Sequence, residues 1–414
     1  MDNLFMKKNN RTGVAFMEKT KVGIIGCGNI SDLYFHNLTH RFGDDIEVIS
    51  CSDIYLEKAE MQAKKYGVSR VYSVEDMLND SDVEIVINIT VPQAHTEINR
   101  AAIKAGKHVF CEKPLALTFE EAKETVRLAE EHHVQIACAP DTFLGAGIQT
   151  CRQLLDEGWI GHVTAGTANF VWPGHEIWHP SPAFYYKKGA GPMFDMGPYY
   201  ISALVAMLGP VKKLTAMVSR ARDMRTITSK PFFGQKIDVE VPTHYSGLLE
   251  FCNGTIITVN MSFDVWISSL PHIELYGLEG SMFCPNPDLF TGPVKVLRGE
   301  NVVDSLVDLD LSSAGTKGNP FDFSGYLKEM PLRYHDPLVK IRGLGVVELA
   351  HSVKLGRPCR ISHDFILHVM EILTAFECAS QENAVYYMTS TCERPAGMPM
   401  NIEMNEDFND KISE

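Results

Sequence analysis

The chain has 414 residues and a mass of 46.2 kDa, more than one compact core usually holds, so we expect two domains. Its hydrophobic content of 45% and charged content of 22% are typical of a soluble globular enzyme. The net charge of −14 argues against binding to nucleic acid or to an anionic membrane, because both need a basic surface. The ten cysteines include no Cys-x-x-Cys pair, which favours reduced thiols and a cytoplasmic location.

A glycine-rich turn follows the first predicted strand, Lys21–Ile25. It is the run Gly26-Cys27-Gly28-Asn29-Ile30-Ser31, a G-x-G-x-x-G pattern with serine in the third glycine position. Gly26 permits the tight turn, and Gly28 lets the backbone approach a pyrophosphate. Asn29 and Ile30 complete the turn as further cofactor contacts, and the helix starting near Ser31 offers its N-terminal amides to the phosphates. The pattern predicts a dinucleotide site.

An acidic residue, Asp53, follows the second predicted strand, Ile46–Cys51. A carboxylate in this position accepts hydrogen bonds from the ribose hydroxyls and repels a 2′-phosphate, which favours NAD over NADP. The alternative is that Asp53 only caps the helical segment that begins at Tyr55.

Strands and helices continue to alternate through the first third of the chain. Further strands are predicted at 84–89, 108–111 and 134–139, with helices ending near Ala105 and His133 between them. Thr118 and Glu121 form a capping box at the start of the second of these helices. This alternation predicts a doubly wound parallel sheet, an α/β Rossmann domain.

Glu112, Lys113 and a proline stand at the carboxyl end of the strand His108–Cys111, where ligands of parallel sheets collect. A lysine there can exchange a proton near neutral pH if burial and neighbouring charges lower its pKa. The alternative is that Lys113 only pairs with a surface carboxylate. We also expect Glu112 and Lys113 to contact the cofactor. After the strand at 84–89, we expect Thr90, Pro92 and His95 to line it.

Beyond residue 140 the pattern changes to strands without intervening helices, which predicts an α+β domain with a large open antiparallel sheet. Asn253-Gly254 predicts a type I′ hairpin. Two helices are expected to close the chain, and the tail is acidic. The predicted divisions are a disordered extension at 1–20, the NAD-binding domain at 21–140, a substrate-binding and oligomerisation domain at 141–392, and the tail at 393–414.

The run His175-Glu176-Ile177-Trp178-His179 matches the zinc motif H-E-x-x-H. That chemistry needs both histidines on one face of a continuous helix, and prolines on both sides of the run argue against such a helix. We therefore expect no metal. The histidines remain candidate ligands of a polar substrate, and we select His179.

The densest group of chemically useful residues lies in and just after the run 189–197. Asp195, Tyr199 and Ser202 recur at helical spacing and can share one helix face. A carboxylate and a phenol together suit a polyhydroxylated ligand. The alternative is that Asp195 caps a helix while Tyr199 packs in the core.

Four motifs in combination resemble those of the Gfo/Idh/MocA family of oxidoreductases. They are Gly26-x-Gly28, the Pro92/His95 segment, Glu112-Lys113-Pro114 and Asp195-x-Gly197. The resemblance runs from about Lys21 to Ser380. It implies a Rossmann domain with an open sheet that builds dimers or higher homo-oligomers, Lys113 as the proton-transfer residue, and a cis Lys113–Pro114 bond. The family's D-x-G-x-H pattern has Tyr199 in its histidine position here, which puts the acid/base assignment in doubt.

These observations predict an NAD-dependent oxidoreductase acting on a secondary hydroxyl of a sugar, glycoside or cyclitol. Lys113 is the first candidate for the base and Tyr199 the second, and Asp195 is the third predicted catalytic residue. The predicted substrate contacts are Asp141, His179, Asp195 and Tyr199. Two alternatives stay open. One is a redox-neutral enzyme that keeps NAD bound and oxidises a glycoside, for example at C3, and the other is a non-catalytic NAD-binding sensor.

Overall fold

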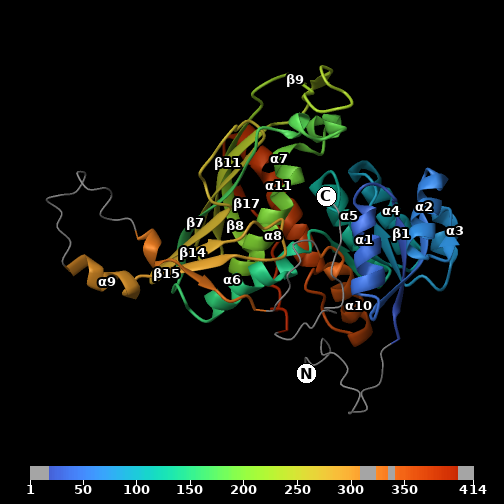
Figure 1. The fold of residues 1–414 in the computed structure, drawn as a ribbon, viewed down its shortest axis with the longest axis horizontal. Helices are drawn as coiled ribbons and strands as arrows, with labels where there is room; N and C mark the ends of the chain where they lie inside the picture. Colours follow the sequence, from blue (N-terminus) through green and yellow to red (C-terminus); the bar gives the residue numbers. More distant parts are fainter. Residues whose placement is uncertain (1–17, 308–322, 334–340, 400–414) are drawn as a thin grey trace, which may run out of the picture. The chain divides into compact units, whose positions relative to one another are not determined.

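The computed structural model describes residues 18–307, 323–333 and 341–399 (Figure 1). Most of the expected N-terminal extension and the tail beyond residue 399 lie outside the described residues. No helix of the described part is long and apolar enough to cross a membrane.

The chain divides into two compact units. The first, here called the Rossmann unit, takes the described residues 18–144, 341–367 and 395–399. The second, the sheet unit, takes 145–307, 323–333 and 368–394. The division therefore differs from the predicted one, because a late segment of the chain returns to the first unit.

The Rossmann unit contains a six-stranded parallel sheet in the order β3-β2-β1-β4-β5-β6. This is the strand order of dinucleotide-binding folds, and it confirms the predicted doubly wound sheet. The strands are β1 (Thr20–Ile25), β2 (Ile46–Ser52), β3 (Arg70–Val71), β4 (Ile85–Asn88), β5 (His108–Cys111) and β6 (Ile136–Cys138).

Helices connect these strands, and half of the predicted capping box is present, because the Glu121 amide donates to Thr118 Oγ1 at 3.2 Å. The Glu121 carboxylate accepts from the Leu117 amide at 3.2 Å, one residue before the predicted partner. The helices are α1 (Ser31–His36), α2 (Leu56–Tyr66), α3 (Val74–Asn79), α4 (Pro92–Lys104), α5 (Phe119–Glu131) and α10 (Leu344–Leu355). A π-helical turn, Asn37–Arg41, extends α1, and a 3₁₀ turn, Thr142–Leu144, follows β6.

The sheet unit is built on nine strands in the order β16-β15-β14-β13-β7-β12-β11-β8-β17. All pairs are antiparallel except β7 with β12, so the sheet is mixed rather than wholly antiparallel. The strands are β7 (Val163–Val171), β8 (Val211–Ser219), β11 (His244–Phe251), β12 (Ile256–Ser262), β13 (Ile273–Gly277), β14 (Gly280–Cys284), β15 (Val294–Arg298), β16 (Lys328–Met330) and β17 (Tyr386–Tyr387).

Helices α8 and α11 run along one side of this sheet (Figure 1). The side chains alternate accordingly, with Leu249 and Ile257 buried while Met217 and Leu248 are exposed on the other face. The remaining elements are α6 (Ala146–Asp156), α7 (Gly191–Asp195), α8 (Gly197–Leu208), α9 (Glu300–Val307), α11 (His363–Glu382, most of it in this unit), the hairpin of β9 (Met224–Thr226) with β10 (Lys236–Asp238), and the 3₁₀ turns η3 (His175–Ile177), η4 (Pro182–Tyr186) and η6 (Ser324–Tyr326).

The β11–β12 hairpin is present, but the predicted type I′ turn is wrong. That turn needs positive φ at both central residues, and only Gly254 has it, at +90°. The Gly254 amide donates to the Phe251 carbonyl at 3.0 Å, and the Phe251 amide donates to the Thr255 carbonyl at 2.9 Å. The extra loop residue makes a longer turn in which Asn253 keeps an ordinary backbone conformation.

Candidate functional site

The glycine turn after β1 has the shape that a dinucleotide needs. Gly26 has φ of +105°, and a Cβ at this position would lie 2.7 Å from the Ile89 carbonyl oxygen. Only glycine therefore fits there. At Gly28, no atom lies within 4 Å of the place where a Cβ would stand, so this backbone is open to close approach by a ligand.

Asp53 is held beside this turn by two backbone amides. Cys27 N–H donates to Oδ2 at 2.7 Å, and Tyr55 N–H donates to Oδ1 at 2.9 Å. The second contact resembles the predicted cap, but Tyr55 itself is the N-cap residue of α2 and makes no side-chain capping bond. Each carboxylate oxygen accepts one amide here and has a second lone pair for a ribose hydroxyl.

At the end of β5, Glu112 is turned into the protein. Tyr34 Oη donates to Glu112 Oε1 at 2.8 Å, and the Lys113 amide donates to Glu112 Oε2 at 2.9 Å. The bond from Lys113 to Pro114 is cis, which confirms the expectation from the family resemblance. Glu112 thus fixes the backbone from which the Lys113 side chain extends.

His95 bridges the loops that follow β4 and β5. Its Nδ1 lies 2.7 Å from the Pro114 carbonyl oxygen and its Nε2 lies 3.1 Å from the Thr90 carbonyl oxygen. Carbonyls only accept hydrogen bonds, so both contacts require a doubly protonated ring. Burial lowers the pKa of His95, but the Cys111 sulfur and the two carbonyls outweigh it and raise the pKa to about 9. The imidazolium therefore ties the Lys113 loop to its neighbour.

Asp141 is fully buried and accepts hydrogen bonds from the backbone amides of Gly343 and Gly345, at 3.0 and 2.9 Å. Burial raises the pKa of Asp141, while Arg342 and the two amides oppose the rise. These contacts hold the start of α10. They engage Asp141 in the structure of the Rossmann unit and give no support to the predicted substrate contact.

In the sheet unit, Asp195 pairs with a histidine. His175 Nε2 lies 2.9 Å from Asp195 Oδ2, and both side chains are largely buried. His175 stands in η3, twenty residues before Asp195 at the end of α7. The prediction that Asp195 and Tyr199 share one helix is wrong, because α7 ends at Asp195 and α8 begins at Gly197. The H-E-x-x-H run drew attention to His175, but its pairing with Asp195 had no signal in the sequence.

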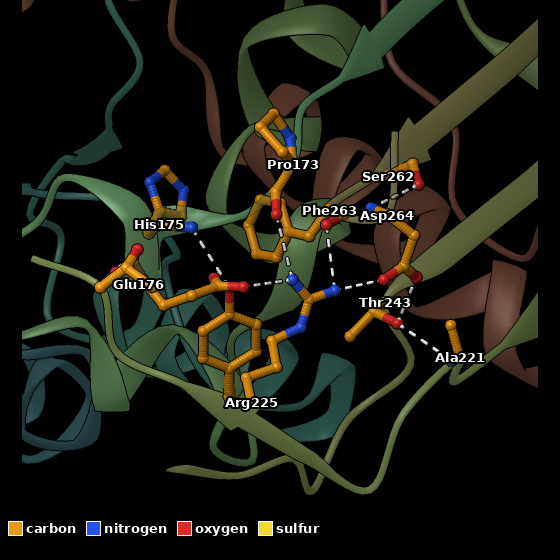
Figure 2. A network of polar contacts seen from close by, with 11 residues as sticks. Pro173, His175, Glu176, Ala221, Arg225, Thr243, Ser262, Phe263 and Asp264 are labelled. Atoms are coloured by element: carbon orange, nitrogen blue, oxygen red, sulfur yellow. Dashed lines mark hydrogen bonds and ion pairs between the residues drawn. The ribbon is translucent and has the colours of Figure 1, made fainter. Parts of the chain in front are cut away.

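A buried ion-pair network, here called the Arg225 clamp, holds the loop that carries His175 (Figure 2). Arg225 donates to Glu176 Oε1 at 2.6 Å and to the Pro173 carbonyl at 3.1 Å. Its other terminal nitrogen donates to Asp264 and to the Phe263 carbonyl. Pro173 and Glu176 lie on either side of His175 in the chain, and Arg225 binds both of them. The clamp therefore fixes the backbone of His175.

His179 lies further along the same loop. The Ser181 amide donates to His179 Nδ1 at 3.0 Å, so this nitrogen carries no proton. Burial lowers the pKa of His179, and the ring is therefore neutral at pH 7 with its proton on Nε2. An Nε2–H group can donate to a substrate hydroxyl.

The H-E-x-x-H run does not form a helix. Only the three residues His175–Ile177 make a 3₁₀ turn, as the flanking prolines predicted. Glu176 is occupied by Arg225 and by the Tyr186 hydroxyl. The described residues contain no group of three or more His, Cys, Asp or Glu side chains arranged to hold a metal ion.

Comparison with known proteins agrees with these features. Residues 20–139 match the model of an oxidoreductase family with an NAD-binding Rossmann fold, and residues 148–283 match the GFO/IDH/MocA C-terminal domain. The chain is 28% identical to the D-glucoside 3-dehydrogenase of Escherichia coli over 59% of its own length and 70% of that protein's. It is 33% identical to the inositol 2-dehydrogenase of Salmonella typhimurium over 34% and 43% of the two lengths.

Two uncharacterised oxidoreductases of Schizosaccharomyces pombe are 25% and 24% identical, and the matches span only 60% and 57% of their lengths. A levoglucosan dehydrogenase structure superposes with a TM-score of 0.72 at 19% identity, over 91% of this chain and all of that one, which shows the shared fold. The two family models together take in more than half of the 414 residues. The chain therefore belongs to the Gfo/Idh/MocA family of NAD-binding oxidoreductases.

Proposed function

We propose that the protein is an NAD-dependent oxidoreductase that transfers hydride to or from a secondary hydroxyl carbon of a sugar, glycoside or cyclitol. The observation that carries this proposal is the Asp53 carboxylate, held by backbone amides beside the open glycine turn of an NAD-binding fold. When bound, NAD supplies hydride exchange at its nicotinamide ring. All other steps fall to residues of the chain.

In this proposal, Lys113 moves the hydroxyl proton, with Tyr199 as the second candidate. Lys113 stands at the carboxyl end of β5, on a backbone that Glu112 and His95 hold in place. A tyrosine with an ordinary pKa near 10 would need a fall of about three units, worth roughly 4 kcal/mol, to act as base at pH 7. Asp195 and His179 orient the substrate hydroxyls as acceptor and donor.

The likeness to D-glucoside 3-dehydrogenase supports a glycoside among the three substrate classes. It also keeps open the redox-neutral alternative, in which NAD stays bound throughout the reaction. We further propose a cytoplasmic location, supported by ten cysteines that form no disulfide in the described residues. A homo-oligomer is supported by the exposed apolar side chains of one sheet face, among them Met217, Leu248 and Ile256.

The test begins with purified protein. Denaturation followed by mass spectrometry identifies any nucleotide that co-purifies, and a panel of sugars, glycosides and cyclitols is then screened with NAD for absorbance at 340 nm. We expect turnover of at least one compound and loss of two hydrogens in its product, with Lys113→Met as the inactive control. Bound NAD without turnover of any compound would instead favour the sensor. Turnover without net NADH would favour the redox-neutral enzyme.

A further inference from the structure

Aromatic rings pack around His175, the residue that pairs with Asp195. Tyr185 stacks on the His175 ring with centroids 3.9 Å apart. Trp178 meets the same ring edge-on at 5.5 Å, and it also contacts His179 at 5.2 Å. Phe184 lies 4.0 Å from Tyr185 and 5.6 Å from His179. Both histidines and the three aromatic residues named here come from the short segment between β7 and α7.

The cluster has a buried inner side and an open outer side. His175 is buried, whereas 54% of Trp178 and 47% of Phe184 remain exposed. Two large apolar rings thus meet solvent directly beside polar side chains that suit sugar hydroxyls. Exposed apolar surface gathered in this way commonly marks a binding site.

The outer rings are carried on a braced segment. The Arg225 clamp fixes its beginning. In its middle, Ser229 Oγ donates to the His179 carbonyl at 2.5 Å. Near its end, η4 buries Tyr186, whose hydroxyl donates to Glu176. Because the backbone is held at three places, the rings are ordered before any ligand arrives, and binding to them costs little conformational entropy.

We propose that Trp178 and Phe184 form a subsite for the second moiety of a glycoside, which is an aryl aglycone or a second sugar ring. Both have a flat apolar face that stacks on an aromatic side chain, whereas a free monosaccharide or a methyl glycoside lacks this second face. The inference rests on the proposed function and narrows it. Glycosides bearing a planar substituent are preferred over free sugars and cyclitols.

The test compares phenyl and methyl glycosides of glucose, galactose and mannose. For the sugar that is turned over, wild-type kcat/KM should be about tenfold or more higher for the phenyl compound. Trp178→Ala and Phe184→Ala should each lower that value about fivefold to tenfold and leave the methyl glycoside within about twofold. A disaccharide of the same sugar distinguishes the two kinds of second moiety. The matched control is Tyr387→Ala, an exposed aromatic on β17 at the far edge of the sheet from β15 and β16.

Calorimetric binding of the same phenyl and methyl glycosides separates this inference from the proposed function. Tighter binding of the phenyl compound that is lost in Trp178→Ala, without any turnover, would support the subsite and refute the oxidoreductase activity. Turnover with equal kcat/KM for phenyl, methyl and disaccharide substrates, unchanged in both variants, would overturn the subsite and leave the activity standing. Absence of both binding and turnover for every glycoside would overturn the subsite as well. Thermal unfolding of each variant confirms that the fold is intact.

Discussion

Replacing Arg225 by methionine removes the cation that two carboxylates of the sheet unit share. Arg225 is 4% exposed at its side chain, and its partners Glu176 and Asp264 are 9% and 17% exposed. Removing one partner of a buried ion pair typically costs about 3–5 kcal/mol, because the remaining charge stays buried without compensation. Here Asp264 also accepts from the Thr243 hydroxyl at 2.6 Å, which relieves part of that cost. We therefore expect Arg225→Met to lower the free energy of unfolding by about 3 kcal/mol, the lower end of this range.

The measurement uses the protein's own tryptophans. All four, Trp159, Trp172, Trp178 and Trp266, lie in the sheet unit, so their fluorescence in urea reports the unfolding of this unit alone. The matched control is Lys187→Met, which removes a partner of Glu240 from an ion pair of 2.6 Å whose side chains are 39% and 50% exposed. An exposed pair of this kind contributes little to stability, because water screens both charges.

The reasoning would be refuted if Arg225→Met lowered the free energy of unfolding by less than about 1 kcal/mol and by no more than the control variant does. It would mean that water or a small backbone shift compensates both carboxylates. In that case the clamp could not be the feature that fixes the His175 loop. A second readout checks the link to function, since a loosened His175 backbone should also weaken substrate binding.

Other predictions concern the cofactor, the proton, the metal and pH. Asp53→Ala should weaken NAD binding and narrow its preference over NADP, and a wild-type preference for NADP would contradict the role of this carboxylate. Lys113→Met should lower kcat by roughly a hundredfold or more while NAD still binds, whereas Tyr199→Phe should act mainly on substrate affinity; the reverse pattern would exchange their roles. Elemental analysis should find no stoichiometric zinc, because Glu176 is already engaged in an ion pair. Burial raises the pKa of Glu371, but hydrogen bonds from neighbouring hydroxyls and amides outweigh it and hold the pKa below the ordinary 4.5. The resulting stability is therefore present above about pH 4.5 and is lost as pH falls through the lower folded value. Urea unfolding at pH 7 and pH 3 should show a larger decrease for wild type than for Glu371→Gln, and equal decreases would exclude this contribution.

The Rossmann unit was predictable because its signals are local. The strand His108–Cys111 has the bounds that the sequence predicts, since a short apolar run ends there at a charged pair and a proline. The Thr118 cap of α5 and the glycine turn at Gly26 likewise depend on residues a few positions apart. Periodicity and turn chemistry act over such distances, and they are readable without the fold.

Contacts between distant parts of the chain could not be predicted from local patterns of this kind. The amides of Gly343 and Gly345 bind Asp141 from some 200 residues away, so nothing near Asp141 indicated that its carboxylate has a structural partner. The two-residue strand β17 also joins the sheet late in the chain, by pairing with β8. A short segment with one or two ladder bonds carries too little pattern to be recognised.

The H-E-x-x-H run shows how local backbone decides what a motif can do. Flanking prolines exclude the helix that would place its two histidines on one face, and each side chain turns to a different partner instead. His175 pairs with Asp195, Glu176 pairs with Arg225, and His179 joins the aromatic cluster. The glutamate that would activate a zinc-bound water thus anchors the loop, and the histidine that would bind zinc orients a carboxylate. Because the chain around this run forms a turn and not a helix, we propose that its residues serve the binding of hydroxyl groups and not of zinc.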